Sequence, residues 1–128
     1  MPVPGIAPTV RWHHVCEGDS HVSLWRAEMI GSILEARAKS TDDALEICRL
    51  FYQSLQLHQE PGWLRGSCMT GLDDPRQVLI HEYWSSRAAW DAWQNSTADR
   101  FLRERSTPLL DTPWEAHLYE GAYVAAPK

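Results

Sequence analysis

The stretch EPGWLRGSCMTGLDDPRQVLIHEYWSSRAAWDAW, residues 60–93, decides the fold that the sequence predicts. Two runs rich in apolar and β-forming residues, 63–71 and 77–84, lie on either side of the turn LDDPR. Asp and Pro favour a turn because the Asp side chain accepts hydrogen bonds from nearby backbone amides and Pro fixes its own φ angle. Two such runs joined by a short turn predict a β-hairpin over residues 63–84.

A strand and a helix precede this hairpin. Residues 29–39, MIGSILEARAK, place alternate side chains on two faces and predict a strand. From residue 41 to 58 apolar side chains recur at helical spacing, which predicts an amphipathic helix. Ser40, with Asp43 three residues later, has the spacing of a helix N-cap. The Pro–Gly pair before the hairpin ends this helix, because neither residue suits a helix interior.

Two helical segments and a further strand follow the hairpin. The first helix is expected to begin at a cap within serines 85–86, and the second at a cap within residues 95–96. Pro108 ends the second helix, and residues 114–124 predict the last strand. The order β-α-β-β-α-β predicts a ferredoxin-like α+β fold, with a four-stranded antiparallel sheet and helices on one face.

The second face of this sheet also needs cover. Ile33 and Leu79 are too apolar to be left in water on that face. Two sheets that stack face to face would bury these side chains. We therefore expect a homodimer that closes into an α+β barrel.

The composition excludes several classes of partner. The chain has 128 residues, which suggests one domain, and its net charge is −5. Lys and Arg do not cluster: Arg100, Arg103 and Arg105 alternate with acidic residues and predict a solvated helix face. We therefore expect no nucleic-acid partner and no anionic membrane surface. No apolar run approaches the roughly 18 residues that a membrane span needs, so we expect no membrane span.

Cysteine usage predicts a reducing compartment. Cys16, Cys48 and Cys68 are odd in number, widely spaced and without a CxxC motif, so we expect no disulfide framework. The N-terminal residues lack the basic and apolar regions of a signal peptide. A cytoplasmic protein is therefore expected. Cys48 and Cys68 have no nearby His or Lys in the sequence, which predicts buried, inert thiols.

The stretch RWHHVCEGDSH, residues 11–21, carries three histidines and a cysteine. Its spacing matches none of the structural zinc patterns, so we expect no metal site. Residues 1–28 are interpreted as an N-terminal arm, 29–124 as the folded domain and 125–128 as a tail. We expect the arm to pack over the sheet edge or a partner subunit, anchored by Trp12 and Trp25. An alternative is a lid that lends a histidine to a cavity.

The quoted stretch, with STPLL and WEAHLYE after it, resembles the antibiotic biosynthesis monooxygenase family. The matching features are the Pro–Gly pair, the Asp–Pro turn and the motif ExWSSRxAW, which carries Glu82, Trp84, Ser86 and Ala89. The resemblance implies a dimeric α+β barrel with one small-molecule cavity per subunit, between helices and sheet. It also implies a monooxygenase that acts on a phenol, quinol or polyketide-like aromatic substrate with O2 and without a cofactor.

Two departures from the family leave alternatives open. Members often carry a histidine where this chain has Trp93, and another near Ala98. Trp93 is similar to the tryptophan of the haem-degrading branch, but the other two haem positions of that branch read Ala36 and Arg103. A haem-binding or haem-degrading protein is therefore one alternative. A polyketide cyclase or a non-catalytic ligand-binding module is another.

The candidate site residues combine the resemblance with strand alternation. His81 and Tyr83 share one face of their strand and suit the roles of base and hydrogen-bond donor to a phenol. Arg37 is expected to bind a substrate carboxylate or to pair with Glu35 or Glu82. The seven tryptophans predict an aromatic cavity or an aromatic core. The expected catalytic residues are Trp93, His81 and Tyr83, and the expected substrate-binding residues are Arg37, Trp63, Trp90 and His117.

Overall fold

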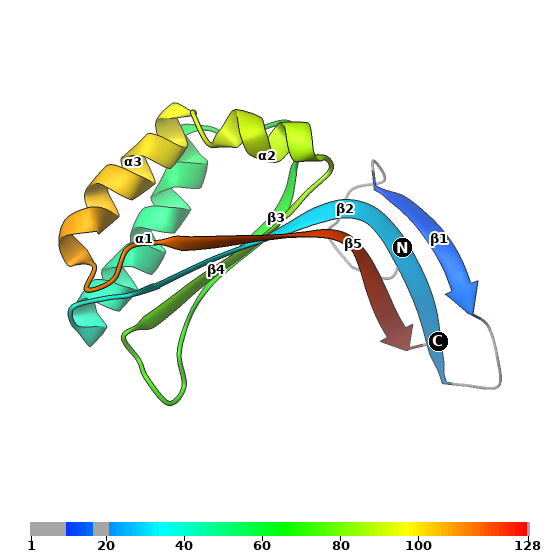
Figure 1. Cartoon of the computed structure of the whole chain (residues 1–128), viewed down its shortest axis with the longest axis horizontal. Helices are drawn as coiled ribbons and strands as arrows, with labels where there is room; N and C mark the ends of the chain where they lie inside the picture. The colour runs from blue at the N-terminus through cyan, green and yellow to red at the C-terminus, as the bar shows by residue number, and fades with distance from the viewer. Residues whose placement is uncertain (1–9, 17–20, 128) are drawn as a thin grey trace.

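The structure is a computed structural model that describes residues 10–16 and 21–127. Its elements are β1 (Arg11–Cys16), β2 (Val22–Arg37), α1 (Thr41–Leu57), β3 (Trp63–Thr70), β4 (Gln77–Trp84), α2 (Arg87–Trp93), α3 (Thr97–Ser106), the 3-10 turn η1 (Thr107–Leu109) and β5 (Glu115–Pro127). From β2 to β5 they follow the order β-α-β-β-α-β, with the second helical region divided into α2 and α3 (Figure 1). The predicted ferredoxin-like α+β fold is confirmed.

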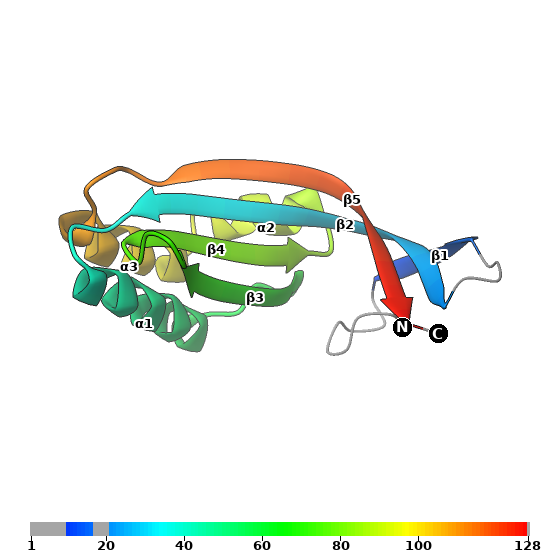
Figure 2. The ribbon, with the colours of Figure 1, turned by 90° about the horizontal axis from the view of Figure 1, so that it is seen from below.

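The central strand of the sheet is β2. It pairs antiparallel with β4 on one side and with β5 on the other, so that Leu34 lies opposite both Ile80 and Ala116. β3 pairs antiparallel with β4 and forms the edge beyond it. All three α-helices cover one face of this sheet (Figures 1 and 2). The other face, which no helix of residues 10–16 or 21–127 covers, is called the open face below.

Serine caps fix where the helices begin. The Ser40 Oγ accepts a hydrogen bond from the Asp43 amide at 3.0 Å, as the sequence predicted. Of the alternatives left open, Ser86 caps α2 and Ser96 caps α3. Capping satisfies amide groups that have no partner inside the helix. The amphipathic face of α1 then packs on the sheet, and the main core cluster consists of Leu34, Leu50, Phe51, Ile80 and Leu102.

The sheet continues beyond the predicted domain start at residue 29. β2 begins at Val22, and β1 pairs with its first half, where the sequence showed no clear period. The β2–β5 register shifts between Ala27 and Ile30, and Gly121 opposite has a φ of 69°. A positive φ favours glycine because it has no Cβ. At this irregularity the sheet bends away from the helices (Figure 1).

The region interpreted as an arm is thus in part a strand of the main sheet. Val10, Ala27 and Met29 form a buried cluster, and Trp12 and Tyr83 pack against it. Trp12 therefore anchors β1 on this chain's own sheet. Residues 1–9 and 17–20 lie outside the described residues, so the lid alternative for that part of the arm stays a prediction.

Gly62 generates a prediction about folding. A Cβ added there would collide with the Cβ of Ala89 and lie 2.8 Å from the Ser85 Oγ, while the Ser85 amide donates to the Gly62 carbonyl. Gly62→Ala should therefore lower the free energy of unfolding by about 1–3 kcal/mol, the usual cost of overpacking. Urea denaturation measures this. In the control Gly31→Ala, the new Cβ meets its nearest atom at 3.9 Å, so equal destabilisation of both variants would contradict the explanation.

Candidate functional site

Four tryptophans gather on the helix-covered side of the sheet. The Trp84 and Trp93 rings lie 5.8 Å apart, and Trp63 and Trp90 pack against the same cluster. The Trp84 Nε1 donates to the Ser32 Oγ at 2.9 Å. The Trp84 ring is thus packed against another ring and its N–H has an acceptor, as a buried indole requires. We call Trp63, Trp84, Trp90 and Trp93 the tryptophan cluster.

A buried carboxyl group borders this cluster. Glu82 is only 3% exposed, and one of its oxygens accepts a hydrogen bond from the Trp63 Nε1 at 2.8 Å. Burial raises the pKa of Glu82 to about 7, the Trp63 hydrogen bond opposes this rise, and the nearby charge of Asp99 adds to it. Glu82 therefore changes its charge near neutral pH, unlike an exposed glutamate.

Asp99 and Arg103 form an ion pair at the start of α3. The Arg103 Nε donates to both Asp99 carboxylate oxygens, at 3.1 and 3.0 Å, and an Arg103 amino group donates to the Gln94 side chain at 3.0 Å. Burial raises the pKa of Asp99, and Arg103 opposes the rise. Of the three arginines expected on a solvated face, Arg100 and Arg105 are exposed, whereas the Arg103 side chain, 41% exposed, pairs with the buried Asp99 four residues earlier.

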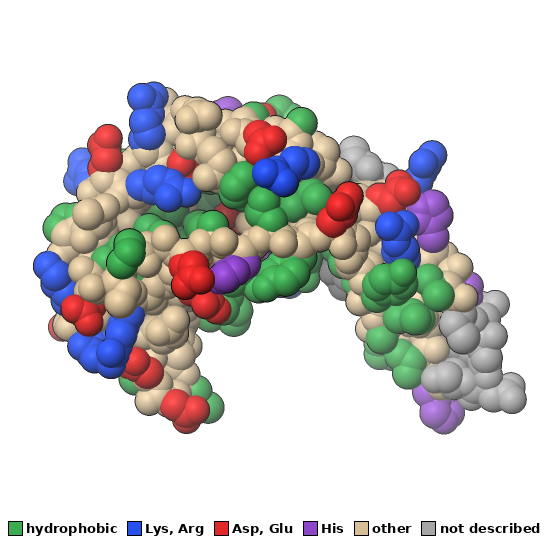
Figure 3. Space-filling model, viewed as in Figure 1, with side chains coloured by type: hydrophobic (Ala, Val, Ile, Leu, Met, Phe, Trp, Pro, Cys, Tyr) green, Lys and Arg blue, Asp and Glu red, His purple; other side chains and the backbone are tan. Residues whose placement is uncertain are grey.

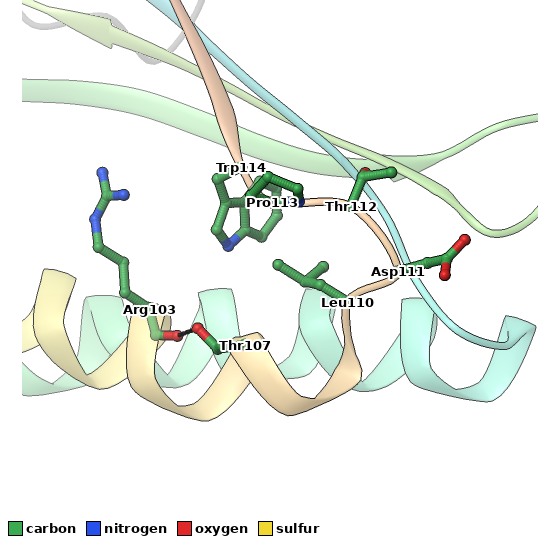
Figure 4. A pocket seen from close by; sticks show the side chains of 7 residues that line it. All are labelled: Arg103, Thr107, Leu110, Asp111, Thr112, Pro113 and Trp114. Atoms are coloured by element: carbon green, nitrogen blue, oxygen red, sulfur yellow. Dashed lines mark hydrogen bonds between the residues drawn. The ribbon is translucent and has the colours of Figure 1, made fainter.

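A cavity of about 460 Å³ opens between α3, η1 and the start of β5. Its lining residues are Arg103, Thr107, Leu110, Asp111, Thr112, Pro113 and Trp114. The Trp114 Nε1 donates to the Ser106 Oγ at 2.9 Å, which holds the indole against α3. Figure 4 shows the Arg103 and Trp114 side chains extending into one space, with Leu110 beside them and the Asp111 carboxylate turned away. The volume suits a small organic molecule.

The predicted tryptophans lie on the helix-covered side but mainly serve packing. Trp93 is 3% exposed, and its ring packs between Trp84 and His58, whose ring stacks at 6.3 Å. Trp90 is half-buried with the Arg87 guanidinium over its ring at 5.4 Å. Trp63 differs because its N–H is bound to Glu82. Among these three, Trp63 therefore has the most direct connection to an ionisable group.

The predicted histidines lie on the opposite side of the sheet. His81 and Tyr83 contact each other on the open face, with ring centroids 4.6 Å apart, and burial lowers the pKa of His81. His117 lies on the same face, because His81 and His117 both pair with Ile33, one from each side. The sheet therefore separates Trp93 from His81 and Tyr83 within one subunit, since successive strand residues point to opposite faces.

Arg37 also lies on the open face. Its Nε is 3.1 Å from an Asp74 carboxylate oxygen in the β3–β4 turn. An ion pair with Glu82 was an alternative in the sequence analysis, and it is wrong because Glu82 pairs with Ser32 on the helix-covered face. Arg37 is anchored at the end of the sheet rather than within the cavity lining.

The histidine-rich N-terminal stretch has other partners. The His14 ring packs on Trp25 at 4.6 Å, and the His13 Nε2 lies 3.4 Å from a Glu28 oxygen. Among residues 10–16 and 21–127, no three His, Cys, Asp or Glu side chains are grouped as metal ligands. The helices in these same ranges are all too short or too polar to cross a membrane.

Sequence reasoning missed Arg103, Trp114 and the ionisable role of Glu82. A signal for Glu82 was present, because it alternates with Ile80 and Trp84 on the inward face of its strand. Such a position predicts a buried carboxyl group with a raised pKa. No comparable signal marks Trp114, because the cavity depends on how the segment after α3 returns to the sheet.

Comparisons with known proteins agree with this fold. The sequence model of one family, antibiotic biosynthesis monooxygenase, matches residues 29–103. None of the curated proteins searched matches the chain.

Solved structures with this fold include three informative examples. A putative antibiotic biosynthesis monooxygenase from Nitrosomonas europaea has 23% identity and a TM-score of 0.63, with 73% of this chain and 89% of that chain covered. SnoaB, a cofactor-independent oxygenase from Streptomyces nogalater, has 11% identity and a TM-score of 0.60, with 73% and 92% covered. The ActVA-Orf6 monooxygenase of Streptomyces coelicolor, solved with nanaomycin D, has 17% identity and a TM-score of 0.64, with 73% and 87% covered.

Glu82 generates a prediction about pH. Its raised pKa means that its contribution to stability is complete below about 4.5 and is lost as the pH rises through about 7. Glu82→Gln keeps an oxygen acceptor for Trp63 but cannot ionise. The variant should match the wild type near pH 4 and exceed it at pH 8 by about 3 kcal/mol in free energy of unfolding.

Denaturant unfolding across pH 4–8.5 measures the difference between the two proteins. The matched control is Glu104→Gln on α3, where the carboxylate is exposed. If the free energy of unfolding depended on pH in the same way for Glu82→Gln and the wild type, Glu82 would have an ordinary pKa and the explanation would be wrong.

Proposed function

The chain belongs to the antibiotic biosynthesis monooxygenase family, and we propose that it oxidises an aromatic small molecule with O2 and without a cofactor. The substrate class is a phenol, quinol or polyketide-like aromatic. Two fold neighbours support this class, since one is described as a cofactor-independent oxygenase and the other was solved with nanaomycin D.

Arg103, whose Nε and one amino group are bound to Asp99 and Gln94, lines the same cavity as Trp114, and this juxtaposition carries the proposal. An indole provides a flat apolar surface on which an aromatic ring packs. A guanidinium close to a phenol stabilises the phenolate and lowers the pKa of the phenol, typically by about 1–3 units for a close charge. The cavity thus combines recognition of an aromatic ring with a group that favours its electron-rich anion.

The phenolate is the form that reacts with O2, because it gives up an electron more readily than the neutral phenol. In the net reaction one oxygen atom becomes the second quinone carbonyl and the other leaves as water. The two hydrogens of that water come from the phenol hydroxyl and from the ring carbon that is attacked. In this scheme Arg103 binds and stabilises the anion, and Trp114 orients the ring.

A haem-based reaction draws less support from these side chains. The guanidinium of Arg103 has no acceptor lone pair for iron, and the ring of Trp93 is packed between Trp84 and His58. Titration of the protein with haem tests this directly. A saturable Soret band would overturn the cofactor-independent scheme.

The open face supports a homodimer as part of the proposal. Ile33 and Leu79 lie on this face as the sequence predicted, and Met69 and Tyr119 on it are 49% and 57% exposed. Figure 3 shows hydrophobic side chains reaching the surface on the concave side of the sheet. Stacking two open faces would cover them and place His81, Tyr83 and His117 at the interface.

Arg103→Gln tests the cavity chemistry. Loss of the charge should lower kcat/KM for O2-dependent turnover by about 10- to 100-fold and move its alkaline rise to higher pH, because the bound phenol becomes less acidic. The readout is O2 uptake with a panel of phenols and quinols. Arg105→Gln is the matched control, since Arg105 is exposed on the same helix and lies over Phe101.

Two further measurements complete this test. Arg103→Lys should restore part of the activity because it restores the charge, and melting curves show whether loss of the Asp99 partner affects folding. Equal turnover by the Arg103→Gln and Arg105→Gln variants would contradict the proposed role of Arg103 in the cavity. Ligand binding with no O2 uptake by the wild type would favour a cyclase or a binding module.

Leu79→Asp tests the dimer. A charge at the centre of a stacked apolar interface should convert the protein to a monomer, as measured by sedimentation velocity. Leu72→Asp is the matched control, because Leu72 is 97% exposed in the β3–β4 turn and should leave the dimer intact. A monomeric wild type would contradict the dimer without affecting the argument for the cavity.

A further inference from the structure

Cys48 and Cys68 are brought together by the packing of α1 on β3. Their Sγ atoms are 2.7 Å apart, although 20 residues separate them in the sequence. Cys68 lies on the inward face of β3, opposite Ile80, and Cys48 follows Ile47, which is buried against the sheet. The expectation of two separate, inert thiols did not anticipate this contact. Both are free cysteines in the structure.

We propose that Cys48 and Cys68 form a redox-modification site, in which a low-molecular-weight disulfide oxidises the pair to an intramolecular disulfide between α1 and β3. The side chains already point at each other from two different elements. A disulfide requires an S–S distance of about 2.05 Å, so the sulfur atoms need to approach by well under 1 Å. Both residues are half-buried rather than enclosed, which leaves a path for a small oxidant.

The two thiols differ in pKa and so have different roles in forming the disulfide. The hydrogen bond between the two thiols lowers the pKa of Cys48 and raises the pKa of Cys68, and burial and the nearby Cys48 and Glu82 raise the pKa of Cys68 further. Cys48 is therefore the thiol that ionises first and attacks, because the thiolate is the nucleophile. Cys68 keeps its proton until the second step.

The thiol–disulfide exchange takes place in two steps. The Cys48 thiolate attacks one sulfur of the small disulfide, which forms a mixed disulfide and releases one small thiolate. Cys68 then loses its proton and attacks the Cys48 sulfur, which closes the Cys48–Cys68 bond and releases the second thiolate. Two protein thiols are oxidised, and one small disulfide is reduced to two thiols.

The closed bond has a structural consequence near the cavity. Cys48 and Cys68 pack against the cluster of Ala38, Ala44, Ile47 and Val78, and Leu110 and Trp114 of the cavity lining pack against the same cluster. A covalent link would restrain α1 against β3 in this layer. Such a link should raise the melting temperature by roughly 10 °C, given the loop length that it closes.

The test uses the full chain incubated with oxidised glutathione and then mapped by non-reducing mass spectrometry. The expected result is a peptide pair joined through Cys48 and Cys68, about 2 Da lighter than the two free peptides. The melting temperature should rise on oxidation and fall again with dithiothreitol. Cys16→Ser should leave both effects unchanged, whereas Cys48→Ser and Cys68→Ser should each abolish them.

The mapping on the wild-type chain does not depend on whether a variant folds. If Cys48 and Cys68 remain open to alkylation after the oxidant, the proposal is wrong. A glutathione adduct on Cys48 that never closes, or a link through Cys16, overturns it as well. None of these outcomes bears on O2 uptake by the reduced protein, so this inference and the proposed function fail separately.

Discussion

Alternation along β4 is the constraint on which the rest of the structure depends. Val78, Ile80, Glu82 and Trp84 all point toward the helices and are buried, while the residues between them point to the open face. Because strand side chains alternate, one register decides which groups meet in the core and which are left for another surface. The same register that buries Trp84 also buries the Glu82 carboxyl. Its burial costs free energy when ionised, which the Trp63 hydrogen bond and protonation near neutral pH both reduce.

Local patterns predicted most of the fold because local physics determines it. The hairpin, the spacing along α1 and the Ser40 cap are each set by residues close together in the sequence. The sequence left residues 21–28 open between a strand and a helical turn and began the domain at residue 29, because the register shift near Ala27 breaks the alternation that identifies one long strand. The bend at Gly121 depends on pairing between residues about a hundred positions apart, which no local pattern records.

The candidate site was predicted less well, for a different reason. His81, Tyr83 and Trp93 were grouped by residue chemistry and by family position, but alternation places the first two across the sheet from the third. Arg103 looked solvated because charges alternate around it, yet Asp99 four residues earlier is buried. A buried carboxylate without a partner costs far more free energy than one in an ion pair. Arg103 therefore turns toward Asp99 instead of extending fully into solvent.

The core layer between the helices and the sheet brings together residues that are far apart in the sequence. Cys48 on α1, Cys68 on β3 and Trp114 at the start of β5 all pack against one cluster around Ile47 and Val78. Protein interiors are packed as densely as organic crystals. A ligand bound or a disulfide formed at one edge of this layer therefore shifts or restrains the side chains next to it. Within residues 10–16 and 21–127 no comparable layer covers the open face, where Ile33 and Leu79 are half-buried, and a second sheet would supply one. Chemistry is therefore best sought on the helix-covered side, and association on the open one.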